Sequence, residues 1–360
     1  MTTDLKINNL AFSLAREACG HTQTSLARAA DVSQAAISQI ESGQLQPSAE
    51  VLGRIGRALG YPESFFRQPF DFRQLPPSFY RRRITDLPQK TIKSARANMN
   101  IFRQQLRTLL DAMELPPVRV PFLDLDELAL SAEKAALEVR RLWDVPPGPI
   151  DNLTTLVERA GIVVVKWDFG TSRMDGFSTY EPAGDLPPLI FVNARLPADH
   201  CRFTLAHELG HLVMHVHLPL VRAEARDIEE DANQFGSSLL MPAGEIRGHL
   251  SGLSVARLAQ LKPFWKVSMA SLLYRAKTLD RVSEHQYTRL WQQLAPYRTV
   301  EPNELSPEEP TLLAQVVRLH LEQLGYSEAD LVKALHTNAE ALRSRYPLPK
   351  PQGGLRVVQS

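Results

Sequence analysis

Residues 202–215 read RFTLAHELGHLVMH, and residues 229–242 read EEDANQFGSSLLMP. In the first stretch, His207 and His211 are four residues apart, so on a helix their side chains project from one face. Apolar residues surround this pair, and Pro242 ends the second stretch because proline cannot continue a helix. The two stretches therefore predict two consecutive helices, over 198–216 and 225–240, with two imidazoles on one face of the first.

The pattern His207-Glu208-Leu209-Gly210-His211 is suited to metal chemistry. Two imidazoles at this spacing can hold one ion, and the glutamate beside the first can take a proton from water that the metal acidifies. Only two cysteines occur, Cys19 and Cys201, in segments predicted to lie in different domains, which excludes a thiolate cluster. We therefore expect Zn²⁺ bound by His207 and His211, with Glu208 as the catalytic base.

The third ligand has two candidate positions. His217 stands ten residues after His207, but Met214 occupies the place where the HExxHxxGxxH pattern uses glycine to turn the chain out of the helix. The rival is a carboxylate among residues 228–235 on the second helix, which gives a His₂Glu site of the thermolysin type. We favour the carboxylate.

Together, these stretches resemble the ImmA/IrrE metallopeptidases, whose pattern is approximately RFTLAHELGHLLLH followed by E-x-x-A-N-x-F-A-x-x-L-L-M-P. The resemblance extends upstream through 147–165 and 190–193 and covers about 125–245. It implies that Glu229 is the third ligand, with Glu230 as the fallback because each helical residue turns by about 100°. The chain departs from the pattern at Gly236, where the family usually has alanine. Because the family's targets are repressors, the resemblance implies a selective regulatory endopeptidase.

Neighbouring polar residues extend this predicted site. His215 lies one turn beyond His211 and can contact a metal ligand or the substrate, although a simple helix-end histidine is the alternative. Asn233 can orient a ligand through its amide. Tyr180, His215 and His249 are open candidates for stabilising an oxyanion.

The N-terminal residues 8–66 predict five short helices from apolar residues at helical spacing. Thr22 and Ser33 are favourable N-caps for two helices joined by a tight turn. The segment resembles the Xre/phage-repressor helix-turn-helix, a lambda-repressor-like fold. The resemblance implies an ion pair between Arg16 and Glu41 and a Gln23 that caps a helix onto a DNA phosphate.

The second helix of that motif hides Ile37 and Ile40 and exposes a polar face. Glutamine on such a face can pair bidentately with adenine in the major groove. We expect operator DNA to contact Gln23, Ser33, Gln34, Ala35, Ser38 and Gln39.

Charge is unevenly spread along the chain. Residues 1–66 contain five basic residues against six acidic ones, whereas residues 67–107 contain ten against two. Since affinity for DNA grows with the number of cations placed at phosphates, the basic segment would have to contribute. The alternatives are that the N-terminal fold is a dimerisation or docking module and that the basic segment is a solvated helix face.

Further patterns complete the organisation of the chain. Strands are predicted over 162–165, 176–180 and 189–193, and helices over 89–113, 128–142, 153–160, 255–261, 268–279, 312–324 and 328–342. The predicted domains are a helix-turn-helix domain (1–70), a basic linker with a long helix (71–124), an ImmA/IrrE-like metallopeptidase domain (125–250), a helical C-terminal region (251–346) and a flexible tail (347–360). The fold class is multi-domain and mainly α, with a small mixed sheet beside the HExxH helix in an α+β domain.

The sequence shows no signal-peptide pattern and no apolar run long enough to span a bilayer, so we expect a cytoplasmic protein without a membrane partner. The favoured hypothesis is a homodimeric DNA-binding transcriptional regulator whose zinc endopeptidase domain cleaves a repressor or antitoxin in a stress, mobile-element or toxin-antitoxin context. The alternative is an antitoxin-like repressor whose peptidase fold is a non-catalytic sensor or toxin-binding module.

Overall fold

A computed structural model describes residues 6–68, 88–111, 113–181, 184–218, 222, 226–298 and 300–348. Its contacts divide the chain into two compact units. Unit 1 comprises the described parts of Met1–Leu75, Ile84–Leu115 and Leu312–Ser360, and unit 2 comprises the described part of Pro116–Thr311. Most of the predicted flexible tail, 349–360, and the predicted linker residues 71–87 lie outside the described residues.

Unit 1 begins with five short helices, as the sequence predicts. They are α1 (Asn9–Ala18), α2 (Gln23–Ala29), α3 (Gln34–Glu41), α4 (Ala49–Leu59) and the 3-10 helix η1 (Glu63–Arg67). The four α-helices are capped by side chains, because Asn8, Thr22, Ser33 and Ser48 each accept a hydrogen bond from a first-turn backbone N–H. Their apolar faces meet in one buried core.

The long helix α5 (Gln89–Leu110) packs against α1 within unit 1. The Ser94 hydroxyl and the Asn98 amide donate hydrogen bonds to the carbonyl oxygen of Ala18, at 2.8 and 3.0 Å. At the other end of α5, a ring nitrogen of His320 lies 2.8 Å from the carbonyl oxygen of Leu109. His320 belongs to α15 (Leu312–Glu322), so α15 is attached to the same unit as the N-terminal helices.

The chain ends its described part with α16 (Glu328–Ala334) and α17 (Ala339–Arg345), also in unit 1. The prediction of one continuous helix over 328–342 is wrong. His336 adopts a left-handed conformation with φ of 46°, and Asn338 starts a new helix by accepting a hydrogen bond from the Ala341 N–H. The predicted C-terminal region 251–346 is thus divided between the two units.

Unit 2 contains a small mixed sheet of β1 (Val163–Trp167), β2 (Gly176–Thr179) and β3 (Leu189–Asn193). The strand order is β1-β3-β2. β1 runs parallel to β3, with Val163 opposite Leu189, and β2 runs antiparallel to β3, with Gly176 opposite Val192. The central strand β3 is buried along its whole length.

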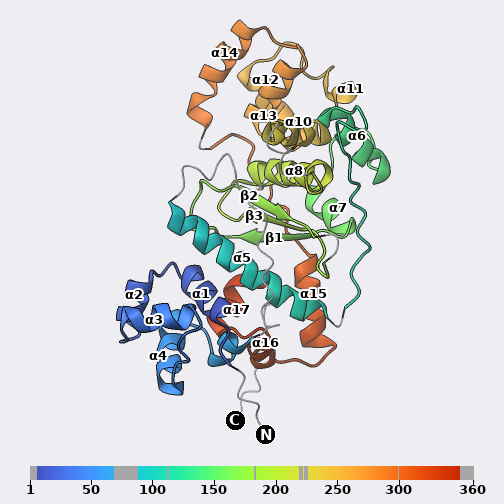
Figure 1. The fold of residues 1–360 in the computed structure, drawn as a ribbon. Coiled ribbons are helices and arrows are strands. Elements are labelled where there is room, and N and C mark those ends of the chain that lie inside the picture. The colour runs from blue at the N-terminus through green and yellow to red at the C-terminus, as the bar shows by residue number, and fades with distance from the viewer. Residues whose placement is uncertain are drawn as a thin grey trace, which may run out of the picture. The chain divides into compact units, whose positions relative to one another are not determined.

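Helices cover this sheet in layers. α8 (Ala198–Met214) contacts β2 and β3, and α10 (Ile228–Leu240) and α6 (Ala132–Leu142) lie beyond α8 (Figure 1). α7 (Leu153–Arg159) packs on β1 and α8. The remaining helices of unit 2 are α11 (Ala243–Ile246), α12 (Val255–Trp265), α13 (Met269–Thr278), α14 (Glu284–Gln293) and the 3-10 helix η3 (Ala295–Tyr297).

Helix starts in unit 2 are set by capping side chains. α6 starts at Ala132 rather than the predicted residue 128, because Ser131 caps it and Ala129 has a left-handed φ of 49°. α10 starts three residues later than predicted, where Asp227 accepts a hydrogen bond from the Glu230 N–H at 3.2 Å. Within the described part of the chain, none of the helices combines the length and the apolar character that a membrane span requires.

Candidate metal centre

Two glycines bring α8 and α10 close together. A Cβ at Gly210 would lie 3.0 Å from the Phe235 ring, and one at Gly236 would lie 3.2 Å from the backbone nitrogen of His207. Neither glycine has a left-handed backbone, so space rather than φ favours glycine here. Gly236, which stands where the family usually has alanine, therefore lies directly against the turn of α8 that carries His207.

Three side chains converge between these helices. The Nε2 atoms of His207 and His211 are 3.1 Å apart. The carboxylate of Glu229, in the first turn of α10, places one oxygen 3.6 Å from Nε2 of His207 and the other 3.5 Å from Nε2 of His211. Ligand atoms at about 2.1 Å from one ion in tetrahedral geometry are about 3.4 Å from each other. The two nitrogens and the carboxylate of Glu229 thus lie at about the spacing that ligands of a single zinc ion require.

The opposite ring nitrogens of both histidines have polar partners. Nδ1 of His207 lies 3.0 Å from Oδ1 of Asn233, and Nδ1 of His211 lies 2.9 Å from Nδ1 of His215. An amide oxygen only accepts, so His207 carries its proton on Nδ1 and presents a lone pair at Nε2. This is the tautomer that a metal ligand needs.

The environment also keeps the imidazole of His211 neutral. His211 is 5% exposed, and burial together with the neighbouring His207 and His215 holds its pKa well below the usual value. A neutral imidazole retains the lone pair that binds a cation. The donor set therefore fits a divalent metal that prefers nitrogen and oxygen ligands.

Glu208 lies beside this group and is held by a strand. It is 8% exposed, and the hydroxyl of Ser178 on β2 donates a hydrogen bond to its Oε2 at 2.7 Å. β2 approaches α8 this closely at Gly176, where a Cβ would lie 2.5 Å from Cγ2 of Thr204. One carboxylate oxygen of Glu208 is thus fixed by the sheet.

The rival ligands lie elsewhere. The carboxylate of Glu230 accepts hydrogen bonds from the Tyr274 hydroxyl and the Gln234 amide, at 3.2 and 3.1 Å. α8 ends at Met214, two residues before the predicted end, and the exposed His217 ring packs edge-on against Phe122 with a centroid distance of 4.5 Å. Nδ1 of His249, an oxyanion candidate, accepts a hydrogen bond from the Trp265 indole at 3.2 Å.

In unit 1, the predicted DNA-contacting residues gather at α2 and α3. Ser33, Gln34, Ala35 and Gln39 are exposed, whereas Ser38 and Gln23 are half-buried. The Ser33 hydroxyl caps α3 by accepting a hydrogen bond from the Ala36 N–H at 3.1 Å.

A polar network joins α1, α2 and α3. The ion pair between Arg16 and Glu41 that the resemblance implies is confirmed. The Gln23 amide donates to Glu41 at 2.7 Å and accepts from Gln34 at 2.8 Å. In this structure, Gln23 and Gln34 therefore bind each other across the turn of the motif.

Comparison with protein families finds one match in each unit. Residues 13–66 match the family model described as helix-turn-helix, and residues 157–277 match a peptidase-family model described as IrrE N-terminal-like domain. The chain joins a helix-turn-helix domain to an IrrE-like peptidase domain. No curated protein matches it.

The IrrE-like match begins in α7 and ends in α13, so it contains the entire group around His207. Sequence reasoning missed Ser178, because its bond to Glu208 links residues thirty positions apart and no local pattern marks it.

Proposed function

We propose that this protein is a transcriptional regulator whose IrrE-like domain is a zinc-dependent endopeptidase that selectively cleaves a repressor or antitoxin. The observation that carries the proposal is the convergence of His207, His211 and Glu229 beside a buried Glu208. A stress, mobile-element or toxin-antitoxin setting accords with the union of DNA-binding and peptidase domains in one chain.

The residues of the site have different chemical roles. His207, His211 and Glu229 would hold the zinc ion, which supplies Lewis acidity to water and to a peptide carbonyl. Glu208 is the general base that takes the water proton and returns it to the leaving amine. The hydrogen bond from Ser178 to Oε2 would fix the carboxylate of Glu208 beside the metal ligands.

Metal analysis tests the ligand set. We expect about one zinc per native chain, a loss of zinc in Glu229→Ala and retention in His217→Ala. The two variants are a matched pair, because both remove one candidate third ligand. Zinc retained in Glu229→Ala, or lost in His217→Ala, would refute the assignment.

Cleavage is tested with Glu208→Gln, which removes the base and keeps the three ligands. New protein N-termini are mapped by chemical labelling in cells that produce either the native chain or this variant. We expect one or a few new N-termini only with the native chain. If zinc binds but both chains give the same N-termini, the non-catalytic sensor or toxin-binding alternative is favoured.

The helix-turn-helix domain would bind a palindromic operator as a homodimer, with α3 in the major groove. Duplexes selected from random DNA would then contain two half-sites, and sedimentation would show two chains on each duplex. Gln39→Ala should weaken binding to the selected duplex more than binding to an unrelated duplex at the same salt concentration. Equal weakening on both duplexes would argue against base recognition by α3.

A further inference from the structure

His215 connects the metal centre to a charged network in unit 2. It follows α8 directly, and its side chain is only 3% exposed. If Nε2 of His211 keeps its lone pair for the metal, its proton lies on Nδ1, and this Nδ1–H would donate to Nδ1 of His215, 2.9 Å away. His215 then carries its own proton on Nε2, on the side away from the metal centre.

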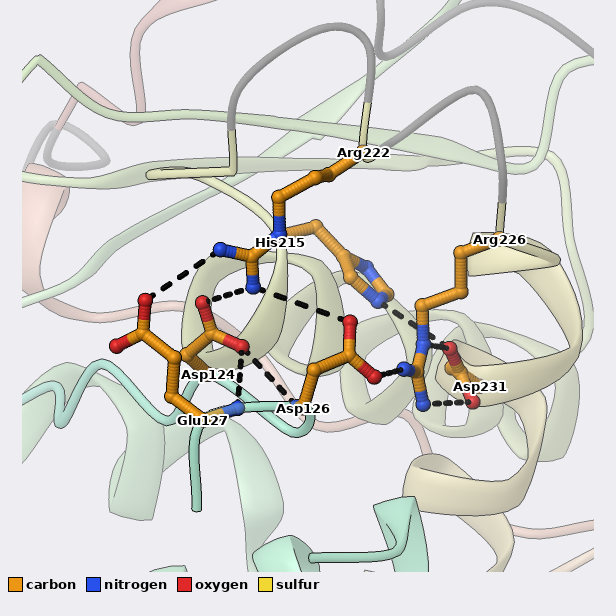
Figure 2. Close-up of polar contacts among 7 residues, drawn as sticks. All are labelled: Asp124, Asp126, Glu127, His215, Arg222, Arg226 and Asp231. Carbon is orange, nitrogen blue, oxygen red and sulfur yellow. Dashed lines mark hydrogen bonds and ion pairs between the residues drawn. The ribbon is translucent and has the colours of Figure 1, made fainter. Parts of the chain in front are cut away.

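That Nε2 faces Asp231. It lies 3.9 Å from Oδ2 of Asp231, which belongs to α10 two residues after Glu229. Asp231 also binds the guanidinium of Arg226, through Nε and, at 3.3 Å, through Nη2 (Figure 2). The carboxylate thus lies between an imidazole and a guanidinium, and Glu229 lies in the same first turn of the helix.

The network ends on the segment before α6. Nη1 of Arg226 donates to Oδ1 of Asp126 at 2.5 Å. Arg222 reaches the same segment, with nitrogen-to-oxygen distances of 3.8 Å to Asp126 and 3.4 Å to Glu127 (Figure 2). Arg226 therefore joins Asp231 to the segment before α6. In the ion pairs of the described residues, Arg222 contacts only that acidic segment.

We propose that Asp231 is a positioning residue of the metal centre, which acts through His215 on His211, and that Arg226 holds Asp231 in place. The inference rests on the proposed metal site and extends it from three ligands to a chain of contacts, His211–His215–Asp231–Arg226. The negative charge of Asp231, 3.9 Å from Nε2 of His215, favours the tautomer that carries its proton on Nε2, so that Nδ1 accepts from His211 and aims Nε2 of His211 at the ion.

Zinc affinity of the full-length chain tests the proposal, measured by competition with a chromophoric chelator. Loss of an outer contact of a metal ligand typically weakens affinity by about 10- to 100-fold, and we expect that loss in Asp231→Ala. The matched control is Glu230→Ala, which removes the adjacent carboxylate of the same helix and should leave affinity unchanged. Arg226→Gln should weaken affinity more than Arg222→Gln, since only Arg226 contacts Asp231.

A double substitution separates this role from a purely structural one. If Asp231 acts through His215, Asp231→Ala adds little to the loss already caused by His215→Ala. Additive losses would overturn the proposal. Circular dichroism of the metal-free chains checks folding, and Asp231→Asn replaces Asp231→Ala if the latter does not fold, with a loss in the same direction expected.

The outcomes distinguish the inference from the proposed function. A native chain without zinc affinity would refute both. A native chain that binds zinc, loses it in His207→Ala and retains full affinity in Asp231→Ala would refute the inference alone.

Discussion

Substitution of Gly176 by alanine is expected to separate what the sheet contributes to stability and cleavage from what the metal ligands contribute to zinc binding. Gly176 opens β2, opposite Val192 of β3, and packs against α8. An added Cβ would lie 2.5 Å from Cγ2 of Thr204, 2.9 Å from the carbonyl oxygen of Phe191 and 3.3 Å from Cγ of Glu208. Rotation of Thr204 cannot relieve the second contact, because that carbonyl belongs to the backbone of β3.

The expected loss in the free energy of unfolding follows from these overlaps. Extra carbon in a packed site costs about 1–3 kcal/mol, and the lower backbone entropy of the unfolded alanine chain returns about 0.4–1 kcal/mol. The net expectation is a free energy of unfolding lower by about 1–2 kcal/mol. For a unit of this size, that loss lowers Tm by about 2–8 °C. β2 must move away from α8, so cleavage should also fall, because Ser178 moves with β2.

Zinc affinity should stay near the native value, since the three ligands lie on α8 and α10. The matched control is Gly244→Ala in α11, where a Cβ meets no atom within 4 Å, and this variant should be as stable as the native chain or more stable. Thermal unfolding, chelator competition and mapping of N-termini give the three readouts. A Gly176→Ala chain as stable and active as Gly244→Ala would refute the close-approach argument.

Three further outcomes are expected. Lys262→Met should lower the free energy of unfolding by about 3–5 kcal/mol, because the 3%-exposed amine binds Asp199 at 2.6 Å and Glu301 at 2.8 Å and its loss leaves both carboxylates without this cationic partner. Urea titration measures this, and Lys266→Met, whose amine is more exposed, is the control. Chelation of the metal should lower Tm, and zinc at about 100 times its Kd should raise the free energy of unfolding again by about 2.7 kcal/mol. An unchanged Tm after chelation would contradict a bound metal. Burial lowers the pKa of His336, so below about pH 6.5 the unfolded chain takes up a proton that the folded chain resists, and the stability of unit 1 should fall as the pH drops. In acid titrations, His336→Asn should reduce this dependence of stability on pH, because asparagine tolerates the left-handed backbone.

The local chemistry of the sequence predicted much of the fold. The N-caps Thr22 and Ser33 mark their helices, because a side chain that binds its own first turn needs no distant partner. The bounds of β3 were predicted correctly at 189–193, where a buried apolar run follows two prolines. The single-helix prediction over 328–342 failed because a helix-forming pattern continues through His336, whose left-handed conformation it does not reveal.

The metal centre shows the same division. The spacing of His207 and His211 follows from the period of one helix, and the sequence by itself determined that both imidazoles share a face. Only the tertiary structure decided which carboxylate meets them, because Glu229 and Glu230 differ by one residue and packing of α10 on α8 sets the rotation. It also decided that Ser178 holds Glu208 and that Arg226 ties Asp231 to Asp126, a hundred residues away. Such contacts depend on how separate elements pack, and no periodicity within one element encodes them.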